Sequence, residues 1–291
     1  MTLVTLDPRA SAPIGAHVRR VLAGLRRIPV GPTIAALVVV FYIVAAIAPS
    51  LLQTHGAFKI DLAAMLQPPS ATHWLGTDQT GRDLYSRIVA GAGQSLSLGL
   101  AATALSLGVA LAFGITAGLV GGVVDLSIAR FLDVLFSFPT LFLALLFLAV
   151  FGTSITTQIV AVGLGTAPGY ARMIRGQVLA VKGAGYVEAA RALGHRPLRI
   201  AVNHIVPNAL RPLVVMMTLG VGQSIVWASG LAFLGLGVAP PSPEWGALLD
   251  AGRNYAIRAW WLEVMPGLAI VGFALAVTVL GRYLRDRLEG K

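Results

Sequence analysis

The chain of 291 residues contains no cysteine, and its acidic residues are few, 12 against 22 lysines and arginines. Without cysteine there are no disulfides, no thiolate metal ligands and no cysteine nucleophile. The sequence G-x-x-x-x-G-K-[ST] is also absent, so no phosphate loop of the usual kind binds ATP here. Neither a nucleophile elbow nor an H-E-x-x-H zinc sequence is present. We therefore expect no catalytic residue in this chain.

Charge is missing from long stretches of the sequence. The mean hydropathy is +0.80, and 56% of the residues are hydrophobic, which is too apolar for a soluble domain of this length. The chain is therefore expected to be an integral protein of the plasma (inner) membrane, in contact with lipid. A net charge of +10 could indicate a nucleic-acid partner, but the basic residues flank apolar stretches instead of forming one accessible face. We expect no nucleic-acid partner.

Metal binding is not predicted from the histidines. They are scattered along the chain without the spacing of a zinc site, so none is expected to be a ligand. The five are His17, His55, His73, His195 and His204.

An all-α fold with six transmembrane helices is predicted from the apolar stretches, since about 20 residues cross a bilayer. Residues 134–171 carry no charge and as one helix would be about 57 Å long, so they must fold back, with the turn at residues 152–154. Residues 88–94 are expected to lie at the interface, ahead of their span. The expected spans are 32–52, 95–119, 134–151, 155–171, one within 212–243, and 264–281. Glycines such as Gly114, Gly118, Gly163 and Gly165 suit close packing of these helices.

The basic residues indicate which side of the membrane each loop faces. Six spans place both termini on one side, and the positive-inside rule makes that side cytoplasmic. The cytoplasmic side then holds the basic tail, residues 1–30, and the loop 172–211, while the segment 53–87 lies outside. The tail is either a short interfacial helix near residues 18–28 or a disordered segment that sets topology, which we favour. Of the 22 lysines and arginines, only Lys59, Arg82, Arg87, Arg253 and Arg258 lie on the outer side.

A polar and basic stretch, YVEAARALGHRPLRIAVNHIVP, occupies residues 186–207 between long apolar runs. Residues 187–193 favour a helix, Gly194 can take the left-handed conformation that stops it, and Pro197 suits the start of another. Ala189 and Ala190 form a face without bulky side chains, which could accept a partner. An ordinary basic loop that only sets topology is the alternative.

Two further stretches suggest ordered loops. Gly76 and Gly81 permit tight turns, and Asp78, Arg82 and Asp83 could close these turns or cap a helix that begins near residue 84. Acid–base catalysis by the two aspartates is the alternative, and we favour capping. The stretch around Trp245, together with Trp260 and Trp261, is expected to be a loop at the membrane interface.

Three motifs carry a resemblance to a known family. They are Glu188-Ala189-Ala190 followed by Gly194 and Pro207, the sequence GTDQTGRD from Gly76, and FLGLGVAPPSPEWG from Phe233. Together they resemble the permease subunits of dipeptide, oligopeptide and nickel ABC importers, in which the first motif is the EAA loop. His204 and Val206 stand where the general EAA pattern has Ile and Leu, and Ala228 stands where this family commonly has Glu.

The resemblance implies a type I ABC importer permease fold, with a transmembrane domain at 31–291, its core at 88–285, and a cytoplasmic coupling loop at 172–211. It also implies a second permease subunit, two ABC ATPases that carry ATP and Mg²⁺, and an extracytoplasmic solute-binding protein. Peptides are the expected solute, and nickel, haem or another small solute are alternatives. The expected ATPase-coupling residues are Tyr186, Glu188, Ala189, Ala190, Gly194, His204 and Pro207.

Two other classes of function remain open from the sequence, a non-transporting membrane scaffold and an ion-coupled secondary transporter. The second would be expected to place an acidic residue or histidine inside a span, and none lies in the middle of one. Polar residues in or near the spans could line a solute path or bond helices to one another, and we favour bonding. These residues are Gln94, Gln158, Gln223 and Ser224.

Overall fold

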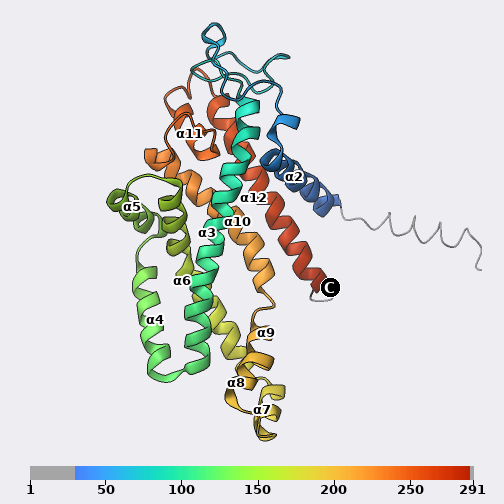
Figure 1. Cartoon of the computed structure of the whole chain (residues 1–291), viewed down its shortest axis with the longest axis vertical. Helices are drawn as coiled ribbons and strands as arrows, with labels where there is room; N and C mark the ends of the chain where they lie inside the picture. The colour runs from blue at the N-terminus through green and yellow to red at the C-terminus, as the bar shows by residue number, and fades with distance from the viewer. Residues whose placement is uncertain (1–29, 289–291) are drawn as a thin grey trace, which may run out of the picture.

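The computed structural model describes residues 30–288, which form helices and connecting loops (Figure 1). Within these residues extended backbone pairs only at one isolated bridge, between Thr77 and Asp83. The all-α prediction is confirmed. The predicted tail lies outside the described residues except for Val30, and so does the interfacial helix predicted near residues 18–28.

Within residues 30–288, seven longer helices build the bundle, and shorter helices join them. The longer helices are α2 (Val30–Ile47), α3 (Leu84–Val120), α4 (Gly122–Ser137), α5 (Thr140–Phe151), α6 (Ile155–Lys182), α10 (Leu213–Leu231) and α12 (Trp261–Leu288). The shorter helices are η1 (Pro49–Leu51), η2 (Leu62–Ala64), α7 (Gly185–Ala192), α8 (Pro197–Ile200), η3 (Ala201–Ile205), α9 (Val206–Ala209), η4 (Ala232–Leu236) and α11 (Trp245–Arg253).

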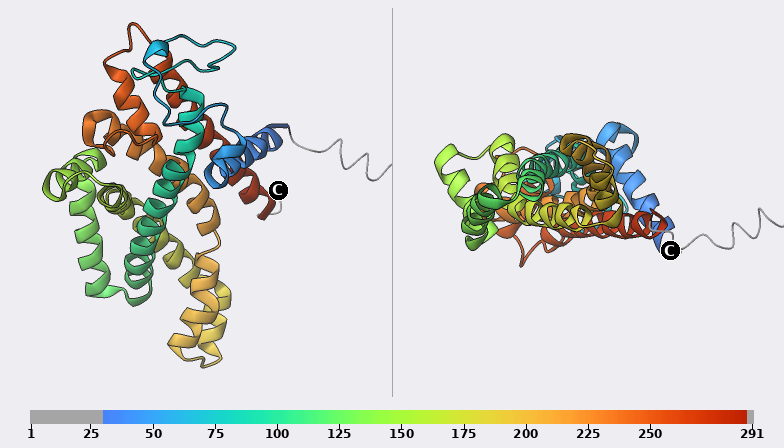
Figure 2. Two further views of the ribbon diagram at one scale, coloured as in Figure 1. Left: turned by 45° about the horizontal axis from the view of Figure 1, so that its top comes forward. Right: turned by 90° about the horizontal axis from the view of Figure 1, so that it is seen from below.

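Helix α3 is the axis of the bundle. It packs along α6 on one side and against α10 on another, while α2 lies against α12, across the bundle from α4 and α5 (Figure 2). A Cβ atom on Gly114 would lie 2.7 Å from the carbonyl oxygen of Ala171, and one on Gly118 would lie 2.6 Å from Cγ1 of Val178. The two glycines are four residues apart and share a face. They allow the close α3–α6 contact expected of small residues in a membrane.

Judged by length and composition, fewer helices of the described residues could span a membrane than the six predicted. Among the described residues, four helical stretches are long and apolar enough to cross a membrane, or five if the bent pair α4–α5 counts as one span. They are Val30–Ile47, Leu84–Val120, Val215–Leu236 and Trp261–Arg287. Helix α6 is outside this set, and its sequence combines polar residues in the first half with Arg172, Arg175 and Lys182 in the second. Six spans therefore stays a prediction.

The span predicted at 134–151 is wrong as a single helix. Helices α4 and α5 meet at an angle of 84°. Phe138 has an extended backbone with ψ 130°, as expected for a residue before proline, and Pro139 precedes α5. Proline lacks the amide hydrogen that would continue the first helix, so the chain turns there.

Two predicted spans belong to longer helices. Residues 88–94 are continuous with the span predicted at 95–119, because α3 runs unbroken over 37 residues from Leu84. At about 1.5 Å per residue the helix is some 56 Å long, well beyond a bilayer core of about 30 Å, so it projects from the membrane. Helix α6 continues past the predicted end at residue 171 to Lys182.

The loop expected at the membrane interface around Trp245 is instead part of the core. Trp245 is the first residue of α11, is fully buried and donates its indole N–H to the carbonyl of Ile88 at 2.9 Å. Trp261 is buried too and bonds the carbonyl of Thr77 at 3.1 Å. Of these three tryptophans only Trp260 is exposed, at 51%. Both buried indoles satisfy their polar atom while filling space, which sequence position alone does not indicate.

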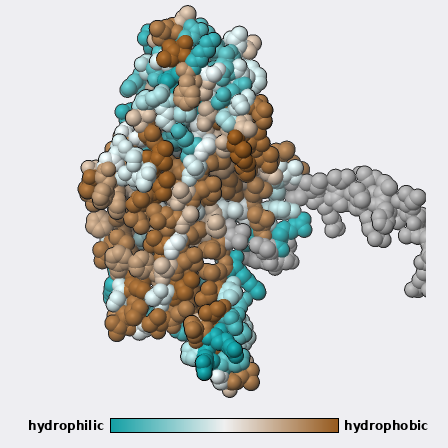
Figure 3. Space-filling model, in the orientation of Figure 1, coloured by the Kyte–Doolittle hydropathy of each residue, from teal (hydrophilic) through white to brown (hydrophobic). Residues whose placement is uncertain are grey.

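Two polar ends flank an apolar middle. Residues 48–83, which we call the cap, lie at the end where α3 begins, and α7 and α8 lie at the opposite end (Figure 1). The surface between them is predominantly hydrophobic (Figure 3). This distribution fits a protein that spans a bilayer, where apolar side chains face lipid instead of water.

Cysteine labelling tests the predicted sidedness, and the natural lack of cysteine makes each introduced thiol unique. Ala71→Cys in the cap and Ile257→Cys after α11 replace exposed residues at one end, and Arg196→Cys lies at the other. In intact spheroplasts a membrane-impermeant maleimide is expected to label the first two at once and the third only after permeabilisation. Labelling of Arg196→Cys without permeabilisation would contradict the topology.

Candidate functional site

The most prominent projecting feature is the distal hairpin, residues 185–209, at the end of the bundle away from the cap (Figure 1). Its first helix, α7, covers Gly185–Ala192, which confirms the helix predicted at residues 187–193. Pro197 is the first residue of α8, as predicted. A π-helical turn, η3, and α9 then lead into α10.

A Schellman motif closes α7. The amide of His195 donates to the carbonyl of Ala190 at 3.2 Å, and the amide of Gly194 donates to the carbonyl of Arg191 at 2.9 Å. Gly194 has φ +77°, a conformation that costs other residues energy because of their Cβ atom. The predicted glycine stop is confirmed, and it sets the angle between the two arms of the hairpin.

The predicted two-alanine face is corrected by the structure. Ala189 is exposed, as are Tyr186 and Glu188, but Ala190 is only 5% exposed. Consecutive helical residues point about 100° apart, so both alanines cannot face the same partner. Ala190 packs inward, and a bulky residue there would disturb the hairpin itself. The outward face consists of Tyr186, Glu188 and Ala189.

The second arm adds a basic and apolar surface. A hollow of about 660 Å³ lies against it, lined by residues that include His195, Leu198 and Val202. His204 lies behind this surface with its ring stacked on that of His195, the ring centres 6.3 Å apart, and Pro207 is exposed. Leu198 and Val202 are 76% and 57% exposed, so the second arm presents apolar side chains at its surface.

The hairpin is packed firmly onto the bundle. Val187 and Ala190 of α7 belong to a buried cluster with Ile174 and Val178 of α6 and with Ile200 of α8. Movement of the hairpin would therefore be passed directly to α6, because close-packed interiors transmit displacement.

Charged contacts reinforce this junction, and sequence reasoning missed them. Lys182 donates to the carbonyls of Gly118 and Leu119 at 3.2 and 2.9 Å, where it neutralises the negative end of α3. Arg175 forms a two-point pair with Asp125 of α4 at 2.5 and 2.7 Å. From the sequence, Lys182 and Arg175 were assigned only to the basic loop 172–211, and the acidic residues Asp125 and Asp133 of α4 were the available signal of a partner.

Comparison with known proteins decides the family. Residues 110–290 match the family model described as binding-protein-dependent transport system inner membrane component. The chain belongs to this family. It is accordingly a multi-pass transport permease of the inner membrane.

Curated relatives and solved structures agree with this assignment. A probable D,D-dipeptide transport system permease protein of Escherichia coli is 38% identical over 267 residues, which cover 92% of this chain and 89% of that protein. A dipeptide transport system permease protein of Alkalihalophilus pseudofirmus is 36% identical over 88% of this chain and 84% of its own length. A structure of the MetNI methionine ABC transporter superposes with a TM-score of 0.57 and 18% identity, covering 69% of this chain and 96% of that one.

All four candidate path residues of the permease make internal hydrogen bonds, and three of them are buried or half-buried. Gln158 is fully buried and donates to the carbonyl of Leu236 at 3.1 Å. Ser224 is buried, 3.0 Å from the hydroxyl of Thr103. Gln94 accepts from the hydroxyl of Ser242 at 2.7 Å. These three side chains therefore make hydrogen bonds within the protein, as the favoured interpretation predicts.

Gln223 differs from the other three because it is exposed on α10. Its side-chain oxygen accepts from the hydroxyl of Tyr170 at 3.1 Å. It lines two surface hollows of about 410 and 530 Å³. Of the four, Gln223 is the one whose position suits contact with solute or with a second subunit.

A pair of leucine substitutions separates these roles. Gln158→Leu is expected to lower the free energy of unfolding by about 1–3 kcal/mol, because the buried carbonyl of Leu236 loses its donor. Its apparent affinity for solute should not change. Gln223→Leu is the matched control and should leave thermal stability within about 0.5 kcal/mol while altering uptake. Thermal unfolding in detergent and uptake kinetics measure both, and unchanged uptake in Gln223→Leu would remove it from the path.

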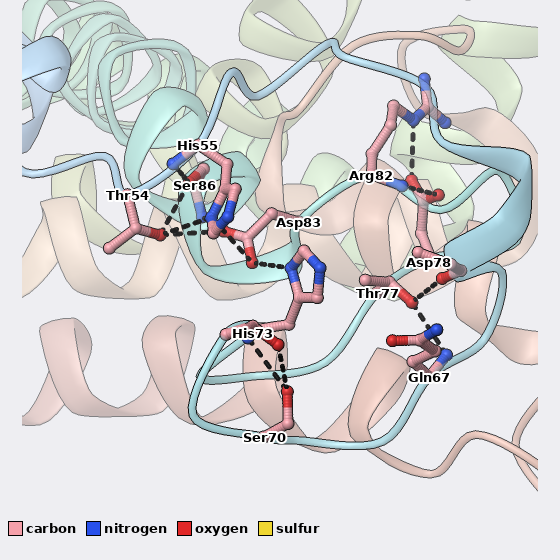
Figure 4. Close-up of polar contacts among 12 residues, drawn as sticks. Thr54, His55, Gln67, Ser70, His73, Thr77, Asp78, Arg82, Asp83 and Ser86 are labelled. Atoms are coloured by element: carbon pink, nitrogen blue, oxygen red, sulfur yellow. Dashed lines mark hydrogen bonds and ion pairs between the residues drawn. The ribbon is translucent and has the colours of Figure 1, made fainter.

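The cap of the permease is closed by the residues predicted for turns. Gly76 and Gly81 have φ of +79° and +75°, and Asp83 caps α3 by accepting from the amide of Ser86 at 2.9 Å (Figure 4). Asp78 accepts from Nε of Arg82 at 2.8 Å and pairs with Arg87. The capping and turn-closing interpretation is confirmed, since both carboxylates are engaged in structural bonds.

Arg87 and Glu244 join the cap to the second loop of the permease. Arg87 donates to the carbonyls of Pro241 and Ser242, both at 3.2 Å. Glu244 is 2% exposed and caps α11, accepting from two of its amides at 2.9 Å and from the hydroxyl of Ser95 at 3.1 Å. Burial raises the pKa of Glu244, although these bonds oppose the shift. Its capping role was missed, and an acid directly before a helix start was the available signal.

Proposed function

We propose that this chain is one permease subunit of an ATP-driven ABC importer for dipeptides and oligopeptides. Family membership supports the transport role. Relatives named as D,D-dipeptide, dipeptide and glutathione transport permeases, at 36–38% identity, support a peptide solute. The fold likeness to a methionine ABC transporter supports the permease architecture.

The distal hairpin is the observation that carries the coupling part of this proposal. Tyr186, Glu188 and Ala189 form the outward face that an ATPase would contact, and Ala189 leaves room for its side chains. Gly194 sets the direction of the second arm, which carries His204 and Pro207. Ala190 anchors the hairpin to α6 instead of contacting the partner.

Energy would then enter the permease from its partners. Two cytoplasmic ATPases would hold ATP and Mg²⁺, because this chain lacks the phosphate loop that usually binds ATP. Closure of the ATPase pair draws together the hairpins of this subunit and of a second permease. The packing of α7 on α6 and the bonds of Lys182 to α3 convert that movement into rotation of the long helices.

The opposite end of the molecule suits a different partner. The cap and α11 form a polar, well-bonded surface at the end predicted to face outward, where a solute-binding protein would deliver its ligand. With six spans, both termini would be cytoplasmic and the hairpin would lie on the side of the ATPases.

Reconstitution tests the proposal. The permease, co-purified with its second permease and ATPases in proteoliposomes, should import a labelled dipeptide only with ATP inside and the binding protein outside. Uptake driven by a proton gradient without ATP would show a secondary transporter. An intact membrane protein that neither transports nor retains an ATPase would show a scaffold. Import of nickel or haem, but not of dipeptide, would correct only the solute.

A further inference from the structure

A cluster of two histidines and one aspartate lies at the junction of the cap with α3. His55 follows α2 and η1, His73 lies in a loop of the cap, and Asp83 is the N-cap residue of α3. One ligand atom from each lies within 4.8 Å of the other two (Figure 4). His55 and His73 are 18 residues apart in the sequence, and folding of the cap brings them together with Asp83.

The three side chains are already oriented toward a common point. Nδ1 of His73 is 2.9 Å from Oδ1 of Asp83, and Nδ1 of His55 is 3.8 Å from the same oxygen. The other carboxylate oxygen of Asp83 accepts from the amide of Ser86, which fixes the orientation of the carboxylate. Oδ1 is the oxygen that faces both imidazoles.

The backbones of both histidines are held as well. The amide of His55 donates to the hydroxyl of Ser86 at 3.0 Å, and the amide of His73 donates to the hydroxyl of Ser70 at 3.0 Å. These two bonds fix the backbone at both histidines, so that each imidazole extends from a held position. The cluster thus has both the donor atoms and their support.

We propose that His55, His73 and Asp83 bind a divalent transition-metal ion, with Zn²⁺ the ion that they suit best. Two imidazole nitrogens and one carboxylate oxygen form a common zinc ligand set. Tetrahedral bonds of about 2.0–2.1 Å place ligand atoms some 3.4 Å apart, between the shortest and longest separations in the cluster. Shifts of about 1 Å bring all three into place.

The fourth position of the ion is open to water. Asp83 is 1% exposed and His73 16%, but the side chain of His55 is 40% exposed, so the ion has a path from solvent. A bound ion would link two separate parts of the cap, at His55 and His73, to the start of α3 at Asp83. These segments are otherwise joined here by hydrogen bonds, such as that of Thr54 to Asp83 at 3.4 Å.

Direct binding measurements test the site without a transport assay. The full chain is purified through a tag without histidine, stripped with EDTA, and titrated with Co²⁺ for the visible spectrum of four-coordinate cobalt. Zn²⁺ retained after desalting is counted by mass spectrometry. One ion per chain is expected, and Zn²⁺ should displace Co²⁺. His55→Ala and Asp83→Asn should each weaken binding by at least about 10–100-fold, the range seen for loss of supporting groups alone.

Two features make the variants informative. Asparagine also caps helices, so Asp83→Asn keeps the bond to Ser86 and preserves folding. The double variant His195→Ala with His204→Ala removes another stacked histidine pair and should bind as the wild type does. If the wild type retains no more Zn²⁺ than His55→Ala with His73→Ala, the cluster is a hydrogen-bonded network only and the proposal is overturned.

Discussion

Asp78→Leu is expected to reduce the stability of the cap by about 3–5 kcal/mol, the cost of breaking a buried ion pair from one side. The carboxylate of Asp78 faces two guanidinium groups, those of Arg82 and Arg87, and the three side chains are 3%, 8% and 3% exposed. Leucine fills similar space but offers no acceptor. Both cations would then be buried without a counter-charge, and the cap would open to hydrate them.

Limited proteolysis measures this opening. Arg82 and Arg87 are buried, so trypsin reaches them only when the cap opens, whereas Lys59 is exposed in the folded protein. A loss of about 3 kcal/mol raises the open population, and cleavage after both arginines, by about a hundredfold. Asp61→Leu is the matched control, since Asp61 is exposed and only caps η2, which is worth about 1 kcal/mol. Equal protection in Asp78→Leu and the wild type would contradict the role of the pair.

Acid should weaken the same contact in the native protein. Burial alone would raise the pKa of Asp78, but hydrogen bonds from Thr80 and Arg82 and the charge of Arg87 outweigh it and lower the pKa. A carboxylate with a lowered folded pKa stabilises the fold above its unfolded value, about 3.9. That stability is lost as pH falls through the lowered pKa. The cap should therefore resist trypsin-like proteases at neutral pH and open only in strongly acidic solution.

Gly194→Val is expected to uncouple the permease from its ATPase while leaving it in the membrane. A Cβ atom at Gly194 would meet nothing within 4 Å, so the whole cost comes from φ +77°. That conformation costs an L-residue about 1–2 kcal/mol, and more for a β-branched one. The strain is relieved by breaking the bond of His195 to Ala190, which swings the second arm away from its native direction.

Two variants serve as controls for the angle of the hairpin. Gly194→Asn should keep most activity, because asparagine tolerates the left-handed conformation. Gly185→Val adds the same side chain at a position in the same hairpin with open space and no left-handed backbone. Co-purified ATPase and ATP-driven dipeptide uptake are measured for all three. A fall of about tenfold is expected only for Gly194→Val, and normal values there would refute the coupling role.

Features encoded by neighbouring residues were predicted well. The helix stop at Gly194, the start of α8 at Pro197 and the cap of α3 at Asp83 each depend on residues within about five positions. Their signals are backbone conformation and the reach of a short side chain. The break at Pro139 could have been predicted in the same way, but the span there was assigned only from the length of the uncharged stretch.

Features that depend on distant packing were not predicted. Ala189 and Ala190 look equivalent in sequence, yet only the second meets the core formed with α6. Trp245 was assigned to an interface because aromatic rings favour both environments, and the contact with Ile88 that buries it is 157 residues away. Bonding was the favoured role for Gln158, but its partner Leu236, which belongs to another helix, could not be named from the sequence.

Composition and local spacing by themselves determined that this protein lies in a membrane, is helical and carries a hairpin between its apolar stretches, because hydropathy, helix stops and caps are properties of adjacent residues. Only the tertiary structure decided which alanine faces outward, which polar side chains are bonded, and that His55 and His73 meet Asp83. Those outcomes depend on how α3 packs with α6 and how the cap folds over α3. Such long-range contacts are set by the fit of surfaces that no short stretch of sequence contains.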